Sequence, residues 1–284
     1  MSRPLRIQYP GAHYHIISRG NGGNNIFRDK WDYQIFLEEL KNAIENHNWI
    51  SYAYCLMPNH YHLYIKTLDP NLSIGMRQLN GNYTQRSNIR HKRYGHLFQG
   101  RFKSILVEDT GYQGELIRYI TLNPIKAKLA KSLDQYPWLS HNEITGKKKK
   151  TGCVNIKEVL KIFHNNNDQA KKEYTRFLKE KHDGKDLEKE IKAGFILGSM
   201  DFAKKVISNY SDKESRENIK KERFADRPEL DKIFKDVGGK KERDKLIFKA
   251  FKDYGYTQAS LGNYLNIHYA SISRIIKDQK ARKI

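Results

Sequence analysis

The stretch MPNHYHLYIK, residues 57–66, combines a tight turn with two histidines that flank one tyrosine. Pro58 and Asn59 are typical turn residues, and the segments on both sides are rich in β-branched and aromatic residues, which predicts a hairpin of two strands. Side chains alternate along a strand, so His60 and His62 share one face. Two imidazoles on one face can hold a metal ion, or they can be two ordinary surface histidines.

Strand and helix patterns alternate on both sides of this hairpin. The predicted strands cover 13–20, 50–57, 60–67 and 102–109, and the predicted helices cover 29–48, 71–93 and 112–123. The last helix should break or kink at Pro124, because proline disfavours helical geometry in the residue before it. Interleaved strands and helices with one hairpin predict an α+β fold, in which helices cover an antiparallel or mixed sheet.

A polar, charged stretch at 146–154 contains four consecutive lysines and no apolar periodicity. It predicts a basic linker that follows a first domain at 1–145. From 155 to 284 the patterns are mostly helical and highly charged, with no obvious strand. We expect this part to be a helical DNA-binding region.

The last part of the chain predicts a helix-turn-helix at 242–280. Helical patterns cover 242–255, 257–266 and 269–280, and a short turn falls near Asn266, a residue that tolerates the left-handed conformation. In this motif the second helix lies in the major groove of DNA, and polar residues near its start face the bases. Those residues would be Ser271, Ser273 and Arg274. Any three-helix bundle can produce the same pattern.

The chain carries a large excess of positive charge. Its 284 residues include 53 Lys and Arg against 32 Asp and Glu, and both halves share the excess: 22 basic against 11 acidic residues in 1–150, and 31 against 21 in 151–284. This charge indicates a polyanionic partner, either nucleic acid or an anionic membrane surface. No apolar run of about 18 residues and no signal-peptide core is present, so we expect a cytoplasmic protein without a membrane span.

The helix predicted at 112–123 carries two further polar side chains. Tyr119 and Asn123 are four residues apart, so they lie on one face of the helix and can point at one site. Taken alone, Tyr119 is equally a packed aromatic residue. A second His-Tyr-His triplet at 13–15 has the same period as the one at 60–62, and periodicity does not separate the two.

Five blocks resemble the catalytic domain of the single-tyrosine HUH transposases, named for a His-hydrophobic-His motif, and in particular the REP-associated tyrosine transposases. The blocks are GAHYHIISRGN (11–21), YCLMPNHYHLYI (54–65), GHLFQGRFKSILVED (95–109), RYITLNPIKA (118–127) and YPWLSH (136–141). They follow the expected order over about half of the chain. The resemblance implies a ferredoxin-like or RNA-recognition-motif-like sheet and an enzyme that nicks and rejoins single-stranded DNA.

The same resemblance assigns roles to individual residues. The metal histidines of the family follow a Met-Pro-Asn turn, which selects His60 and His62, with Asn123 as a third ligand and Tyr119 as the nucleophile. The triplet at 13–15 matches a position without a catalytic role. The cofactor implied is a divalent metal, Mg²⁺ or Mn²⁺, and mixed nitrogen and oxygen ligands suit Mn²⁺. Attack by tyrosine would give a 5′-phosphotyrosine and a free 3′-hydroxyl, so strand transfer needs no nucleotide cofactor.

The partner implied is single-stranded or hairpin DNA, held by basic residues with interleaved aromatic rings. The candidate DNA contacts are Arg19, Arg86, Arg90, Arg93, Gln99, Arg101 and Lys103. Many of them can equally be solvated residues on helix faces. Two other functions stay open: a transposase-derived DNA-binding regulator without active catalysis, and an RNA-binding protein, because a helix-covered antiparallel sheet also binds RNA. Both a monomer and a homodimer fit the sequence.

Overall fold

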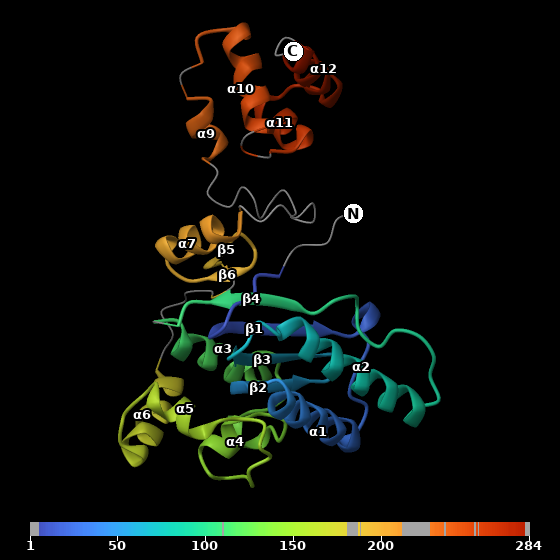
Figure 1. Ribbon diagram of the computed structural model, residues 1–284, viewed down its shortest axis with the longest axis vertical. Coiled ribbons are helices and arrows are strands. Elements are labelled where there is room, and N and C mark those ends of the chain that lie inside the picture. The colour runs from blue at the N-terminus through green and yellow to red at the C-terminus, as the bar shows by residue number, and fades with distance from the viewer. Residues whose placement is uncertain are drawn as a thin grey trace. The chain divides into compact units, whose positions relative to one another are not determined.

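The structure is a computed structural model and describes residues 6–109, 111–180, 187, 189–211, 228–235, 237–252, 254 and 256–281 (Figure 1). The chain divides into two compact units, Arg6–Ala203 and Lys204–Ile284. The first unit contains a mixed sheet with helices on its faces, and the described part of the second is helical. The predicted α+β class is confirmed.

A four-stranded antiparallel sheet forms the centre of the first unit. Its strands are β1 (Ala12–Arg19), β2 (Trp49–Met57), β3 (His60–Thr67) and β4 (Lys103–Val107). They lie in the order β2-β3-β1-β4, and each pair of neighbours is antiparallel. All four strands match the predicted segments to within two residues at each end, and the hairpin turn lies at Pro58-Asn59 as expected.

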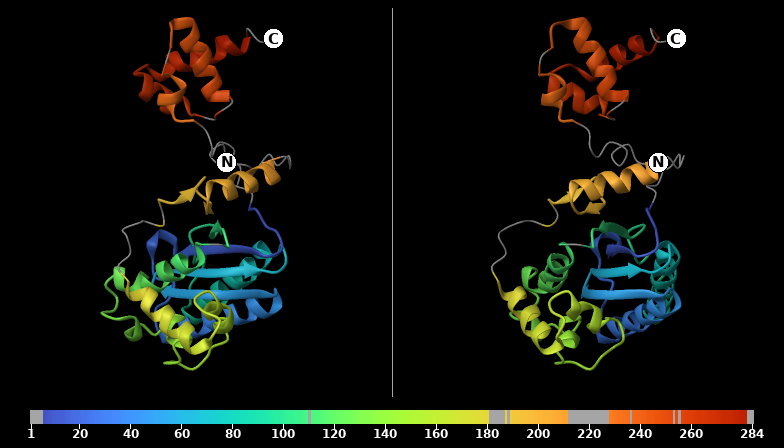
Figure 2. Two further views of the ribbon diagram at one scale, coloured as in Figure 1. Left: turned by 90° about the vertical axis from the view of Figure 1, so that its left-hand side faces the viewer. Right: turned by 60° about the vertical axis from the view of Figure 1, so that its left-hand side comes forward.

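Three longer helices pack on this sheet. Helices α1 (Lys30–Asn46) and α2 (Leu72–Arg90) cover one face, and α3 (Gln113–Lys126) covers the other (Figure 2). The predicted break at Pro124 is wrong, because α3 continues through it to its last turn. The fixed φ of proline is itself helical, and buried Ile117, Ile120 and Pro124 hold the helix against the sheet.

The alternation of side chains assigns each strand residue to one of these faces. His15 on β1 lies opposite Tyr64 on β3, so the two share a face. Tyr64 packs in the same hydrophobic cluster as Ile117 of α3. Tyr61 points to the opposite face, where its ring packs against Phe36 of α1 at a centroid distance of 4.7 Å. The histidines of both triplets therefore face α3.

The first unit does not end at the predicted linker. It continues to Ala203, because Val154, Val159 and Tyr174 are buried in the hydrophobic cluster that also contains residues of α3. The shorter elements between these points are α4 (His141–Ile144), α5 (Ile156–Lys161), α6 (Asn167–Lys179) and the 3-10 helices η1 (Asn21–Gly23) and η2 (Leu133–Gln135). The segment that was predicted to be a linker is thus partly core.

A buried carboxylate fixes this segment. Glu143 accepts hydrogen bonds from the hydroxyl of Tyr54 on β2 and from the backbone N–H of Thr151, the latter at 2.7 Å. Cys153 follows directly and is fully buried. The lysine run at 147–150 is therefore the tip of a loop whose two ends are attached to the sheet.

Two very short strands extend the sheet in a region predicted to be helical. β5 (Ile191–Lys192) and β6 (Ile196–Leu197) form a hairpin, and β6 pairs with β4 in parallel. The complete order is β2-β3-β1-β4-β6-β5. Two-residue strands leave no alternating pattern in a sequence, so the expectation of a mostly helical region without strands was wrong at this point. Helix α7 (Met200–Ser211) follows the hairpin.

The described part of the second unit contains α9 (Leu230–Ile233), α10 (Lys240–Lys252), α11 (Gln258–Leu265) and α12 (Tyr269–Ala281). The Thr257 side chain caps α11 by accepting from Ser260 N–H, and Asn266 ends it in the left-handed conformation with φ 52°. The predicted turn is therefore confirmed. Residues 181–186, 188, 212–227, 236, 253, 255 and 282–284 of the predicted helical region lie outside the described residues.

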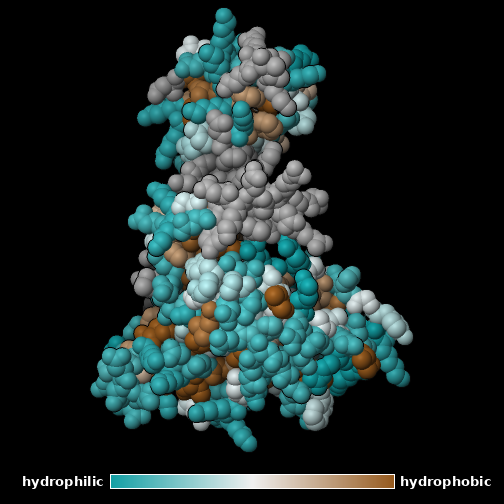
Figure 3. Space-filling view, viewed as in Figure 1, coloured by the Kyte–Doolittle hydropathy of each residue, from teal (hydrophilic) through white to brown (hydrophobic). Residues whose placement is uncertain are grey.

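The face of the molecule in Figure 3 is mostly hydrophilic over the described residues, with small groups of apolar side chains between the polar ones. Among those residues, no helix combines the length and the apolar character needed to cross a membrane.

Candidate active site

The structure places the imidazoles of His60 and His62 beside each other on the sheet face covered by α3. His62 lies in a row with Ile17 of β1 and Cys55 of β2, and it is buried. His60 begins β3 and is half-buried. The two ring centroids are 5.0 Å apart and their planes are nearly perpendicular, at 79°.

Each of the two imidazoles uses its Nδ1 atom within the protein. Nδ1 of His62 lies 2.9 Å from Nε2 of His15, and Nδ1 of His60 lies 2.7 Å from Oδ1 of Asn59. A histidine that binds a metal ordinarily has its second nitrogen fixed by such a partner. Since Nδ1 is engaged in both rings, Nε2 is the atom through which His60 and His62 would bind a metal.

Burial keeps these imidazoles neutral. It lowers the pKa of His62 well below its ordinary value, and the neighbouring His15 and His60 lower it further. Burial, and then the charge of Arg19, lowers the pKa of His60. Burial, with a contribution from Lys103, lowers the pKa of His15 to about 3. Neutral imidazole is the form that binds metal ions.

Tyr119 reaches this site from α3 of the same chain. Its ring lies edge-on to His62 and to His15, at centroid distances of 5.8 and 5.7 Å. Nζ of Lys126, two turns later on α3, lies 5.1 Å from the centre of the Tyr119 ring. The predicted nucleophile therefore shares a site with the predicted metal pair, and a cation that was not predicted accompanies it.

Asn123 lies one turn after Tyr119, and its amide nitrogen donates to the Tyr119 carbonyl oxygen at 2.8 Å. This bond leaves Oδ1 of Asn123 as the atom able to bind a metal. Among the described residues, no group of three or more His, Cys, Asp or Glu side chains is placed to hold a metal ion. Two fixed, neutral imidazole nitrogens and one amide oxygen would suit Mn²⁺ and tolerate Mg²⁺. That Asn123 and the two histidines bind one ion stays a prediction.

Residues 8–123 match the family model described as "Transposase IS200 like". This segment, which we call the transposase segment, is similar to the IS200-like transposases. It starts before β1 and ends at Asn123, so the four predicted site residues all lie within the transposase segment. A solved structure described as "Structure of the REP associates tyrosine transposase bound to a REP hairpin" is similar with a TM-score of 0.46 and 18% identity, over 55% of this chain and 90% of that chain. The comparison with curated proteins finds no match.

Several predicted DNA contacts surround the site of the transposase segment. Arg19 is exposed and lies opposite His60 in the β1–β3 ladder. Lys103 is exposed and lies opposite Ile17, in the same row as His62. Gln99 and Arg101 are exposed on the loop before β4, and the Gln99 N–H donates to the Arg19 carbonyl oxygen at 2.8 Å.

Two other predicted contacts hold helices together. Arg86 pairs with buried Glu39 at 2.7 Å, and Arg90 pairs with fully buried Asp32 at 2.7 Å. Both arginines lie on α2 and both carboxylates on α1, on the sheet face away from Tyr119. We therefore assign Arg86 and Arg90 to the contact between α1 and α2. Arg93, just after α2, is half-buried.

In the second unit, the predicted base-reading residues lie at the start of α12. Ser271 and Arg274 are exposed and Ser273 is half-buried, while Ile272 and Ile276 point into the hydrophobic cluster of this unit. The helix therefore presents polar side chains to solvent as predicted. That they contact DNA stays a prediction.

His15 was not predicted to belong to the candidate active site. Its triplet carries the same pattern as the one at 60–62, and the signal that reveals it is the pairing of β1 with β3, which brings His15 diagonally next to His62. A shift of one residue in that pairing would turn His15 to the other face of the sheet.

Proposed function

We propose that this chain cleaves and rejoins single-stranded DNA with Tyr119 as the nucleophile. The observation that carries the proposal is the position of the Tyr119 ring, edge-on to His62 and His15 of the same chain. The family of the segment supports a DNA-processing enzyme of the transposase class. Because one chain supplies both the histidines and the tyrosine, we expect Tyr119 to act in cis.

In the proposed reaction, the Tyr119 oxygen attacks the scissile phosphorus and the bond to the 3′-oxygen breaks. The products are a 5′-phosphotyrosine and a 3′-hydroxyl, and attack by the 3′-hydroxyl of another strand reverses the step. A free tyrosine has a pKa of about 10 and needs activation near neutral pH. The ammonium of Lys126 near the ring favours the phenolate.

The remaining groups position the substrate. A divalent ion bound by His60, His62 and Asn123 would act as a Lewis acid on the phosphate. The exposed cations of Arg19 and Lys103 flank the histidine pair and would bind neighbouring phosphates. Their long, flexible side chains suit a single strand, whose backbone is accessible to the nucleophile.

The test is a covalent-adduct assay on the full chain. A labelled single-stranded hairpin from the DNA that flanks the coding sequence is incubated with Mn²⁺ or EDTA, and a denaturing gel follows. We expect a metal-dependent shifted band that is lost in Tyr119→Phe and kept in Tyr112→Phe, a matched change at the start of α3. An adduct that persists in Tyr119→Phe would contradict the proposal.

The C-terminal helices favour a second candidate function, a DNA-binding regulator without active catalysis. Helices α11 and α12 are joined by a turn at left-handed Asn266, and α12 exposes Ser271 and Arg274. We infer that this unit binds duplex DNA. Sequence-specific duplex binding in EDTA, without an adduct on any hairpin, would favour the regulator. Loss of that binding in Arg274→Ala would locate it on α12.

A further inference from the structure

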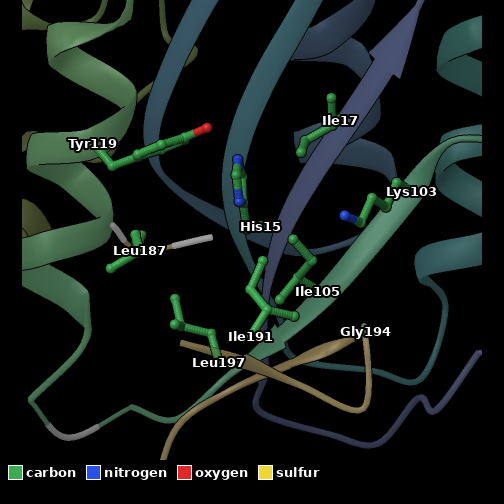
Figure 4. A pocket seen from close by; sticks show the side chains of 9 residues that line it. All are labelled: His15, Ile17, Lys103, Ile105, Tyr119, Leu187, Ile191, Gly194 and Leu197. Atoms are coloured by element: carbon green, nitrogen blue, oxygen red, sulfur yellow. The ribbon is translucent and has the colours of Figure 1, made fainter. Parts of the chain in front are cut away.

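A cavity of about 230 Å³ lies beside Tyr119 (Figure 4). One side comes from the transposase segment, through Ile17 of β1 and Ile105 of β4. The other side comes from the β5–β6 hairpin, through Ile191 and Leu197, which follow the end of the family match. A later part of the chain thus completes a cavity at the proposed nucleophile.

The hairpin is fixed to the edge of the sheet. Leu106 N–H donates to the Phe195 carbonyl oxygen at 2.7 Å, and Glu108 N–H donates to the Leu197 carbonyl oxygen at 2.8 Å. The carboxylate of Glu108 also accepts from Ser199 N–H at 2.6 Å. The cavity wall that the hairpin provides is therefore a continuation of the sheet.

The lining of the cavity combines apolar side chains with a few polar ones. Five of the nine lining residues are isoleucine or leucine, and the polar side chains among the rest are those of Tyr119, His15 and Lys103. Lys103 and Gly194 are exposed, so the cavity opens to solvent beside them. An apolar site with a few placed polar groups suits a flat, mostly apolar ligand with one hydrogen-bonding edge.

We propose that this cavity holds one unstacked nucleobase of the single strand, next to the phosphate that Tyr119 attacks. The proposal rests on the proposed function. A base offers two apolar faces to Ile17 and Ile191, and an edge with acceptors to Lys103. A water molecule takes about 30 Å³, so the cavity admits a base ring that displaces several waters. The hairpin would then determine which base stands beside the cleavage point.

The experiment combines a cavity-filling substitution with abasic DNA. All variants carry Tyr119→Phe, which binds without forming an adduct. Ile191→Trp fills the cavity, and Phe195→Trp is the control, because Phe195 lies in the turn of the same hairpin, does not line the cavity and is already aromatic. The probe is a labelled single-stranded hairpin from the flanking DNA, with one abasic site moved along its tail. The dissociation constant is measured for each position.

In the parent protein, we expect one abasic position to weaken binding about ten-fold, which is in the range measured for one stacked base. Ile191→Trp should weaken binding of intact DNA by a similar factor. In this variant, an abasic site at the sensitive position should weaken binding no further. Phe195→Trp should behave as the parent. Ile191→Ala, which removes one wall, should reduce the abasic effect to less than about three-fold, and it tests the proposal if the tryptophan variant does not fold.

Equal abasic profiles in the parent and both Ile191 variants would overturn the proposal and leave the cavity as a gap in the packing. Because binding is measured without cleavage, this result does not depend on the nucleophile. The covalent-adduct assay tests the role of Tyr119 separately, so failure of the base site and failure of the proposed function can be told apart.

Discussion

Nε2 of His15 lies 2.9 Å from Nδ1 of His62, and both rings are buried. A neutral imidazole has one N–H and one acceptor nitrogen. If His62 binds a metal through Nε2, its Nδ1 must carry the hydrogen. This N–H then donates a hydrogen bond to Nε2 of His15. The histidine of the first triplet would then fix the tautomer and the orientation of the proposed ligand in the second.

Replacement of His15 should therefore weaken metal binding although His15 is not a ligand. We expect His15→Phe to lower the affinity for Mn²⁺ by about 10- to 100-fold, the usual effect of removing the partner of a metal-binding histidine. Titration followed by the electron paramagnetic resonance of free Mn²⁺ measures it. His15→Gln keeps an acceptor and should restore part of the affinity.

The control for this experiment is His13→Gln. His13 lies on the same strand and face, but its Nδ1 bonds the Tyr64 hydroxyl at 2.9 Å rather than His62. It should bind Mn²⁺ as the unmodified protein does. If His15→Phe also retained full affinity, His15 would have no part in metal binding.

Substitutions of Arg90 and Arg19 should affect different properties. The first should lower the stability of the fold, and the second should weaken DNA binding. Arg90→Ala leaves Asp32 buried with fewer partners, so we expect it to lower the free energy of unfolding and to leave hairpin binding unchanged. Arg19 is exposed beside His60. Arg19→Ala should keep the stability, weaken hairpin binding and reduce the slope of log K against log salt by about 0.7.

Urea unfolding and binding at several salt concentrations provide the two measurements. A loss of DNA affinity in Arg90→Ala without a loss of stability would reverse our assignment and support the original prediction from the sequence.

Lys126 should assist the ionisation of Tyr119. We expect Lys126→Met to slow adduct formation at pH 7 by about 2- to 30-fold, since a cation over an aromatic face contributes about 0.5–2 kcal/mol. The deficit should shrink at higher pH, where the hydroxyl ionises without help. Single-turnover rates between pH 7 and 9 test this, with Lys131→Met as the control, a lysine beyond the end of α3. A deficit that is constant with pH would contradict the role.

The central sheet could be predicted because its strands are long and strongly patterned. The segments between the seven predicted strands and helices of the first 123 positions contain clear turn signals such as Pro58-Asn59, and apolar periodicity placed α1, α2 and α3. The boundary near residue 150 failed for a physical reason. Whether Glu143 binds Tyr54 depends on a contact between residues 89 positions apart, and a run of lysines looks the same at the tip of an attached loop as in a free linker.

The sequence could predict which site residues are neighbours only where both residues lie on the same strand or helix. Spacing placed His60 with His62 and Tyr119 with Asn123. His15 and Lys126 depend on strand pairing and on how α3 packs, which the pattern does not encode. Backbone hydrogen bonds to β4 hold the β5–β6 hairpin at the edge of the sheet. Such bonds do not depend on the type of side chain, so the sequence gives little indication that this hairpin joins the sheet.

The buried histidines should make the fold sensitive to acid. Burial lowers the pKa of His13 to about 4, with Lys66 adding to the effect and Asp109 opposing it. The unfolded chain binds this proton below about pH 6.5, and the folded chain does not until about pH 4. The stabilising contribution is thus complete above pH 6.5 and is lost as the pH falls toward 4. For His13 alone we expect a loss of unfolding free energy on the order of 1–2 kcal/mol by pH 5.

Urea unfolding at pH 7.5 and 5.0 measures this loss, and His13→Gln, which can still bond Tyr64, should lose less. His96→Gln, a change at an exposed histidine, should lose as much as the unmodified protein, and an equal loss in His13→Gln would show that the acid sensitivity comes from elsewhere.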